Sequence, residues 1–528
     1  MSISVSPQGN WPKARQLFFS LAFICANFSV FSAAHAATST VTTSPGAAPL
    51  AAAFDLKGWQ ADYVFLKQQL QKQYANLAWF ATPQGKVNLP QLDLYTQKAL
   101  ALAGNDEQAR AVLRNFIDAF HDGHLRLAAR QDSTAKPGTD NEPAVVAIDN
   151  MSMENACAAI GVGSTGRVQF SLPVESLPGF SLFSDGVAQA FRAGIMTTEK
   201  GGKLGILRIP RFREIENPGL CSYAWNALVA ARQPVNVRKL KNAMADAWFD
   251  VLASHLARMK NTGVQALIVD VGGNGGGNDF GDWTARLLTA APVRSAPLLM
   301  AAGPIAHAYL EEELRGMRKV HDDPAYAKTT QRAGMQAAMA TFEKAQADMS
   351  TRSCDLSWVW QEQRPWQAEG CSNLARVGFA SGPYAYLPVT PETETDYAGH
   401  MYWPANVDKY RGSWTGLVYV LTDRGVGSAA EAFVAIMKDN GVAKTIGTVT
   451  AGSGCGNMQA IRPITLPHSK LSFQAPDCVR LRKDGSDEVM ANIPDISLEP
   501  LPGESDRARA ARLIHNVEQD LASARPLP

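Results

Sequence analysis

A serine, Ser428, lies where a predicted strand gives way to a predicted helix. The apolar run Leu417–Leu421 predicts a buried strand, a turn follows at Asp423–Gly425, and the next residues have the apolar spacing of a helix that ends at Gly441. Such a serine has two interpretations. It caps the helix by accepting a hydrogen bond from a nearby amide, or it is a nucleophile, because unpaired amides and the helix dipole also favour an oxyanion beside Ala429.

A second stretch, Val264–Phe280, combines a strand, a glycine loop and a helix. Its strand is fully apolar up to Asp270, a cluster of glycines follows, and a helix is predicted from Asp279. This order brings backbone amides close to an anion. The glycines match neither the dinucleotide-binding pattern nor the P-loop pattern, so a nucleotide site is not favoured.

Together the two stretches resemble the C-terminal-processing, or tail-specific, serine protease family. In that family one strand ends in Asp-x-Arg-x-Asn-x-Gly-Gly, and a later strand leads into Ser-Ala-x-Glu. The matching residues here are Asp270, Asn274, Gly276, Gly277, Ser428, Ala429 and Glu431. The family's arginine falls on Gly272. Its general-base lysine, within a G-x-x-T-x-G-K-G segment that matches 447–454, falls on Ser453, so the chain departs from the serine/lysine dyad.

The tricorn-core-like branch of the family uses a histidine and a glutamate instead. The segment Phe120–Leu127 resembles that branch's Asp-Gly-His-Thr segment, and Glu488–Asp495 resembles its Glu-x-x-Gly-Val-x-Pro-Asp segment. The resemblance therefore implies a Ser/His/Glu site with His124 as base and Glu488 as the acid that orients it. Other acids and bases stay open as alternatives: Asp487 or Asp484 for the acid, and Lys444 or Lys438 for the base.

The resemblance also implies a fold and a mechanism. The alternation of strands and helices predicts an α/β core, and the family refines this to a ClpP/crotonase-like β-β-α superhelix. Ser428 attacks a peptide carbonyl, His124 takes its proton, and backbone amides of Ala429 and of Gly276 or Gly277 hold the oxyanion. Such a secreted serine endopeptidase acts on peptides or unfolded proteins and requires no metal or organic cofactor.

Two other functions remain open at this stage. One is a catalytically inactive pseudoprotease of the same fold that binds peptides or small ligands, which the lost lysine motivates. The other is an esterase or other acyl hydrolase that uses the same groups.

The N-terminal residues predict secretion. Lys13 and Arg15 precede the apolar run Leu17–Phe31, and Ala34-His35-Ala36 matches a signal-peptidase site. This predicts a cleaved signal peptide at 1–36 and a periplasmic or extracellular protein. No membrane span is expected after cleavage.

The cysteines predict disulfides. Seven are present and Cys25 leaves with the signal peptide, which leaves an even set for an oxidising compartment. Their order alone predicts the pairs Cys157–Cys221, Cys354–Cys371 and Cys455–Cys478.

The charge balance argues against some partners. The precursor has 50 basic and 49 acidic side chains, and loss of Lys13 and Arg15 leaves a net charge of −1. Such a balance does not favour a nucleic-acid partner. The oligomeric state is not predicted.

The length predicts several domains, because the mature chain of about 490 residues exceeds one ordinary core. Helices are predicted near 55–74, 106–120 and 237–259, and strands at 168–172 and 203–209. The expected organisation is a flexible leader (37–52), an N-terminal helical domain that carries His124 (53–130), a small intermediate domain (131–202), a catalytic core (203–295 and 411–503), a helical insertion (296–410), and a C-terminal helix and tail (504–528). A PDZ domain lies near 151–200 in many relatives, but no carboxylate-binding glycine loop marks one here.

Overall fold

The computed structural model describes residues 53–128, 148, 150–162, 168–232, 235–322, 324, 331–351, 354–368, 370, 372–379, 407, 409–458 and 463–524. The predicted signal peptide and leader lie outside these ranges. Residues Phe54–Pro528 form one compact unit. Within the described ranges, no helix combines the length and the apolar character needed to cross a bilayer.

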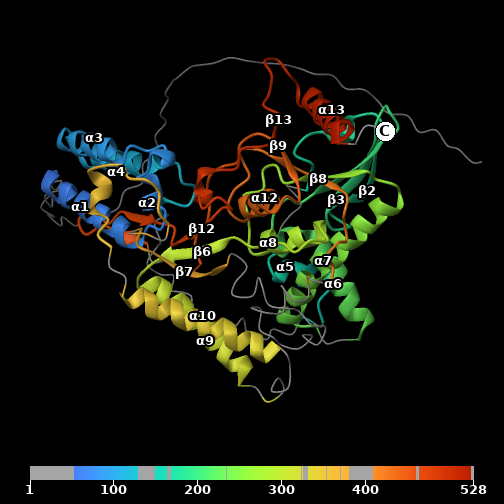
Figure 1. The fold of residues 1–528 in the computed structure, drawn as a ribbon, viewed down its shortest axis with the longest axis horizontal. Helices are drawn as coiled ribbons and strands as arrows, with labels where there is room; N and C mark the ends of the chain where they lie inside the picture. The colour runs from blue at the N-terminus through green and yellow to red at the C-terminus, as the bar shows by residue number, and fades with distance from the viewer. Residues whose placement is uncertain are drawn as a thin grey trace, which may run out of the picture. The chain divides into compact units, whose positions relative to one another are not determined.

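A seven-stranded mixed sheet lies at the centre of this unit, in the order β13-β9-β8-β5-β4-β3-β2 (Figure 1). Its strands are β2 (Phe180–Asp185), β3 (Arg192–Thr197), β4 (Lys203–Arg208), β5 (Ala266–Asp270), β8 (Leu417–Thr422), β9 (Lys444–Gly447) and β13 (Ile496–Ser497). The strands β4, β5, β8, β9 and β13 run parallel to one another, β3 pairs antiparallel with β4, and β2 pairs antiparallel with β3. The predicted α/β core is confirmed.

Both faces of the sheet are covered, which explains why β5 is apolar up to its last residue, Asp270. On one face Leu267 and Val269 pack in a core with the helices α6 (Pro218–Ala230), α7 (Val237–Asn261), α8 (Phe280–Thr284) and α12 (Ala429–Asp439). On the other face Ile268 packs in a core with α13 (Asp506–Ala524). The alternation of neighbouring residues between two cores is the period of a strand.

The N-terminal helices form a second core. They are α1 (Leu56–Gln73), α2 (Leu77–Phe80), α3 (Leu89–Ala101) and α4 (Asp106–Asp118). Their core also contains Val359 and Trp360, from η6 (Ser357–Trp360), and Phe473, from β11 (Ser472–Gln474). β11 lies between β1 (Arg126–Leu127) and β10 (Ile464–Thr465) in a small antiparallel sheet. Distant parts of the chain therefore complete the region that carries His124.

The insertion at 296–410 is helical only in part. It contains the helices α9 (Pro304–His321) and α10 (Gln331–Thr351), which lie side by side in Figure 1. It also contains β6 (Pro297–Ala301) and β7 (Leu374–Phe379), which form an antiparallel sheet with β12 (Cys478–Arg480). The prediction of a helical insertion did not include these two strands, because the pairing that stabilises β6 is made with strands far away in the sequence.

The expected strand at 168–172 is absent from the described structure. Ser171 instead donates its amide and hydroxyl, each at 2.6 Å, to the carboxylate of Asp270. The backbone amide of Ser171 is thus bound by the side chain of Asp270 and not by a neighbouring strand. The remaining short elements are α5 (Met153–Ala159), η1 (Pro83–Gly85), η2 (Val174–Ser176), η3 (Glu214–Glu216), η4 (Ala285–Leu288) and η7 (Glu488–Met490).

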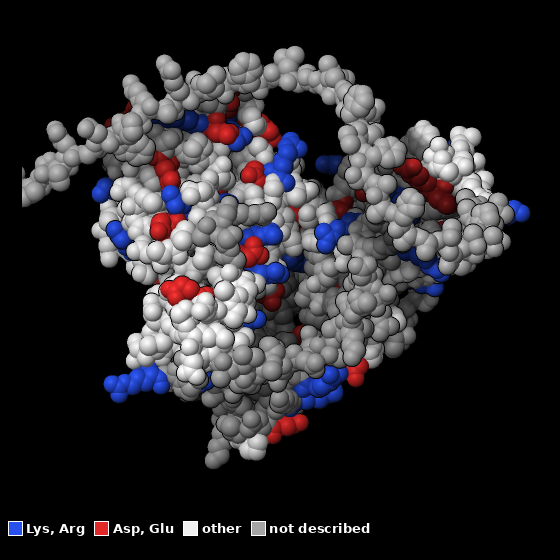
Figure 2. Space-filling model, turned by 180° about the vertical axis from the view of Figure 1, so that it is seen from behind, with Lys and Arg blue, Asp and Glu red and all other residues white. Residues whose placement is uncertain are grey.

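Two of the three predicted disulfides are present. Cys157–Cys221 joins α5 to α6, and Cys455–Cys478 joins the loop after β9 to β12. The third prediction involves Cys371, which lies outside the described residues. On the face shown in Figure 2, basic and acidic side chains are interspersed over the described surface.

Candidate active site

Ser428 has a backbone conformation that a helix cap does not require. It lies one residue before α12 with φ 55° and ψ −125°, and its side chain makes no capping hydrogen bond. A positive φ is uncommon outside glycine and strains the backbone by about 1–3 kcal/mol. The side-chain cap, one of the two interpretations of this serine, is therefore not formed, and the half-buried Ser428 lies at the start of α12 next to the amide of Ala429.

The glycine loop lies against Ser428. A Cβ atom added to Gly276, whose φ is +105°, would lie 2.7 Å from Cβ of Ser428 and 2.9 Å from the amide nitrogen of Ala429. The loop reaches this position because Asn274 accepts from the amide of Gly276 and its side chain donates to the carbonyl of Ile209. Only glycine allows the two segments to approach so closely.

The structure distinguishes between the two predicted loop donors. The amide of Gly276 already donates to Asn274 at 2.9 Å. The residues on both sides of Gly277 are bound to the backbone of Phe212. The amide of Phe212 donates to the carbonyl of Gly276, and the carbonyl of Phe212 accepts from the amide of Asn278. The amide of Gly277 takes part in neither bond, and within the described residues it has no hydrogen-bond acceptor. Gly277 and Ala429 line the same cavity, so we favour this pair of amides over Gly276 for holding an oxyanion.

His124 is fixed by its backbone and by its ring. Its amide donates to Asp122 at 2.8 Å, and the other oxygen of Asp122 accepts from Tyr74 and Asn76. Nδ1 of the ring lies 2.9 Å from the carbonyl oxygen of Ser453. Because a carbonyl can only accept, Nδ1 carries a hydrogen, and in the neutral ring Nε2 then has the lone pair that a general base needs.

Ser453, which occupies the lysine position of the family, therefore contributes its backbone. The loop that contains it is held by Glu431, which is fully buried on α12. Its carboxylate accepts from Thr450 Oγ1 at 2.5 Å and from the amides of Gly452, Ser453 and Gly454 at 2.6, 2.7 and 3.2 Å. Burial raises the pKa of Glu431, and these donors oppose the shift. The sequence resemblance matched Glu431 to the family but gave it no role. These hydrogen bonds indicate that Glu431 holds the loop at 452–454 in place.

Glu488 does not contact His124 by any described hydrogen bond. One oxygen of its buried carboxylate pairs with Nε of Arg480, and the other has no hydrogen-bond partner in the described structure. Arg480 in turn donates from Nη2 to the carbonyls of Ser428 and Gly454, at 3.1 and 3.0 Å. The predicted direct contact that orients His124 is thus made by Ser453, and Glu488 reaches the nucleophile's backbone through Arg480. Burial raises the pKa of Glu488, and the Arg480 charge opposes this.

The alternative acids are in different surroundings. Asp487 is buried, and burial together with the charges of Asp122 and Glu488 raises its pKa well above the usual range. Asp484 is exposed and accepts from the amide and hydroxyl of Ser486. Neither makes a described hydrogen bond to His124.

The alternative lysine bases have partners of their own. Lys438 donates to the carbonyl of Ile493 and pairs with Asp495, and Lys444 pairs with Asp520. Neither lysine lines the cavity that Ser428 borders. The geometry therefore favours His124 over both.

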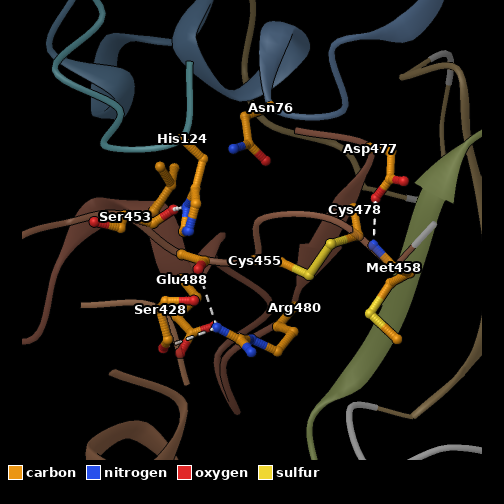
Figure 3. The surroundings of a disulfide bond; sticks show 12 residues. Asn76, His124, Ser428, Ser453, Cys455, Met458, Asp477, Cys478, Arg480 and Glu488 are labelled. Carbon is orange, nitrogen blue, oxygen red and sulfur yellow. Dashed lines mark hydrogen bonds and ion pairs between the residues drawn. A yellow bond between two sulfur atoms is a disulfide. The ribbon is translucent and has the colours of Figure 1, made fainter. Parts of the chain in front are cut away.

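Ser428 and His124 border one cavity of about 300 Å³. Figure 3 shows the ring of His124 pointing toward Ser428 and Glu488, while Arg480 approaches from the side of β12. The Cys455–Cys478 disulfide lies beside them, and Met458 is held by its amide, which donates to Asp477 at 2.9 Å. Sequence reasoning missed Arg480. The predicted disulfide was the available signal, since it brings a residue two positions after Cys478 close to the loop at 452–454.

An uncapped serine beside two amides and a base-competent histidine is a site of the serine-hydrolase class. The family model described as "Peptidase family S41" matches residues 321–475, a range that contains Ser428 and Ser453. A search of curated proteins found no match.

Solved structures share the fold over most of the chain. The structure of mature CPAF is 14% identical with a TM-score of 0.50, and the match covers 88% of this chain and 97% of that chain. Mature CPAF complexed with lactacystin is 14% identical with a TM-score of 0.51, and the match covers 88% and 98%. At such identities the likeness establishes the fold. The S41 match adds that residues 321–475 are similar to peptidase family S41.

Proposed function

We propose that this protein is an extracytoplasmic serine endopeptidase in which Ser428 is the nucleophile and His124 is the general base. The observation that carries the proposal is the geometry of Ser428, whose strained backbone and uncapped hydroxyl border the same cavity as His124. Strain of this kind persists where the surrounding structure enforces it, and it is typical of functional sites.

In the proposed mechanism, Oγ of Ser428 attacks the carbonyl carbon of a peptide bond while Nε2 of His124 takes the hydroxyl proton. The carbonyl oxygen becomes an oxyanion that accepts from the amides of Gly277 and Ala429. His124 then gives its proton to the leaving amine, and a water molecule hydrolyses the acyl-enzyme by the same steps. Loss of one oxyanion donor typically costs on the order of a hundredfold or more in rate.

In this proposal Glu488 acts indirectly, through Arg480. The carbonyl of Ser453 orients the ring of His124, and Glu488 holds Arg480 against the carbonyls of Ser428 and Gly454. Glu488 is therefore a positioning residue, with no described hydrogen bond to the base.

The location outside the cytoplasm rests on the sequence and on the disulfides. The N-terminal segment has the pattern of a signal peptide, and the disulfides of the folded chain are typical of oxidising compartments. N-terminal sequencing of the exported protein tests this part, with Ala37 expected as the first residue.

Labelling with a fluorophosphonate probe tests the mechanism. Wild type should be labelled, Ser428→Ala and His124→Ala should not, and Ser453→Ala should keep its labelling because it retains the backbone carbonyl. A folded wild type that takes no label would favour the pseudoprotease alternative. Comparison of matched ester and peptide substrates separates an esterase from a peptidase.

A further inference from the structure

Two carboxylates line the cavity beside Ser428 and have no role in the mechanism above. They are Asp279, immediately before α8, and Asp282, within its first turn. They lie two and five residues after Gly277, whose amide is a proposed oxyanion donor, and they line the same cavity as Gly277.

Asp282 is buried and only half satisfied. Its Oδ2 accepts from the hydroxyl of Ser295 at 2.6 Å and from Arg286 at 3.3 Å. Its Oδ1 is buried and has no hydrogen-bond partner in the described structure. A buried carboxylate oxygen without a donor is costly and rare in native proteins. It therefore marks a place where a donor from a ligand can arrive.

Asp279 has no described hydrogen bond through its side chain, although it stands at the start of a helix. It keeps exposed surface in the cavity. The surrounding protein and the charge of Asp282 raise the pKa of Asp279 to about 7, and Glu313 adds to this rise while Arg480 opposes it.

The cations near the cavity are already neutralised. Arg286 pairs with Asp282, and Arg480 pairs with Glu488. Nε and Nη2 of Arg480 are also occupied by Glu488 and by two backbone carbonyls. A substrate carboxylate is therefore a poor fit, and Asp279 is left as a cavity carboxylate with no described ion pair.

The remaining wall suits an aliphatic chain. Ala432, Met458 and the Cys455 half of the disulfide line the same cavity as the two carboxylates. Lysine and arginine side chains place methylene groups along apolar surfaces and keep the cationic head with polar partners. The volume of about 300 Å³ lies at the lower end for ligand pockets, which suits one side chain.

We propose, on the basis of the function proposed above, that this cavity is the S1 subsite and binds the cationic head of a lysine or arginine. In acyl transfer the carbonyl in the oxyanion site belongs to the residue before the scissile bond. The side chain of that residue branches one bond away from the carbonyl carbon. Since Gly277 and Ala429 border the cavity with Asp279 and Asp282, this side chain enters the space that the carboxylates line.

Peptide substrates that differ only at P1 test the proposal, with arginine, lysine, citrulline, leucine and glutamate compared. Citrulline matches the shape of arginine without its charge. We expect kcat/KM for arginine to exceed that for citrulline by about ten- to a hundredfold, as a charge-assisted hydrogen bond in a buried site provides. Asp279→Asn should abolish most of this ratio. Asp282→Asn should act in the same direction.

Asp118→Asn is the matched control, because it removes the same charge from the exposed end of α4. It should leave the ratio unchanged. Asp282→Asn removes the partner of Arg286 and can impair folding, whereas Asp279→Asn removes no described hydrogen bond and keeps the test decisive.

Two readouts separate this proposal from the proposed function. Equal rates for arginine and citrulline in an enzyme that takes the fluorophosphonate label would overturn the subsite and leave the mechanism intact. The Ser428→Ala protein provides the second readout, through equilibrium binding of peptides that end in arginine or citrulline. Preference for the arginine peptide supports the subsite even if the wild type takes no label, and equal binding overturns it.

Discussion

Replacement of Glu431 by glutamine tests whether a buried carboxylate on the nucleophile's helix positions the general base. Oε1 of Glu431 accepts from Thr450 and Gly452, and Oε2 accepts from Ser453 and Gly454. Glutamine keeps one acceptor oxygen and turns an NH₂ group toward the other two donors. Two hydrogen bonds to a charged group are lost, each worth about 1.5–3 kcal/mol.

The net effect is smaller than that sum, because the substitution also removes a charge from a buried site. Burial raises the pKa of Glu431, which shows that the charged form is disfavoured there. We therefore expect the free energy of unfolding to fall by about 2–4 kcal/mol. The loop at 452–454 should loosen, so that the Ser453 carbonyl no longer holds Nδ1 of His124. The rate of fluorophosphonate labelling should fall at least about tenfold in protein that is still folded.

Urea denaturation followed by tryptophan fluorescence measures the first quantity, and the time course of labelling measures the second. Glu343→Gln is the control, since Glu343 pairs with Arg318 on the surface with about half of each side chain exposed. Its effect should stay within about 1 kcal/mol. A Glu431→Gln protein with wild-type labelling and a loss under about 1 kcal/mol would refute the role of this carboxylate.

Three further predictions concern the glycine loop, a disulfide and a buried acid. Gly276→Ala should reduce labelling by at least about a hundredfold, because its Cβ would collide with Ser428, whereas Gly263→Ala, with an open surrounding and a similar positive φ, should keep labelling even if it loses stability. Removal of the Cys455–Cys478 bond by a double alanine substitution should lower the free energy of unfolding by about 3 kcal/mol and slow labelling. Thermal denaturation measures the first effect and the fluorophosphonate probe the second. An unchanged stability and labelling rate would speak against a role of this disulfide at the site. Asp487 has a folded-state pKa above its unfolded value, so the folded state binds more protons and the free energy of unfolding should fall as pH rises from about 4 to its folded pKa, by up to about 1.4 kcal/mol per pH unit. Urea titrations at several pH values should therefore show Asp487→Asn gaining stability relative to wild type as pH rises, and a parallel pH dependence of the two proteins would contradict the assignment.

The elements of the core were predictable because each carries its own pattern. The apolar run at β5 and the helical spacing of α7 are local, and the structure places both within one or two residues of expectation. Ser428 was identified at the correct junction for the same reason. Its backbone conformation was not, since φ depends on how closely Gly276 approaches, and that approach is a tertiary property.

Predictions that depended on long-range pairing were less complete. His124 was predicted as the base from a short motif, but the carbonyl that its ring contacts belongs to Ser453, 329 residues further along the chain. Glu488 was predicted as the acid that orients His124, yet its described partner is Arg480, to which no motif pointed. The strands of the insertion were missed because both pair at long range: β6 pairs with β12, more than a hundred residues later, and β7 pairs with β6 across the two helices between them.

The composition of the N-terminal core has a consequence for how the protein is made. The helices that precede His124 pack against Ile464, Leu466 and Phe473, residues that the ribosome adds after Ser428. During synthesis, Ser428 and His124 are therefore both present before the residues that complete this core. In the mechanism proposed above, the site would assemble only after nearly the whole polypeptide has been made.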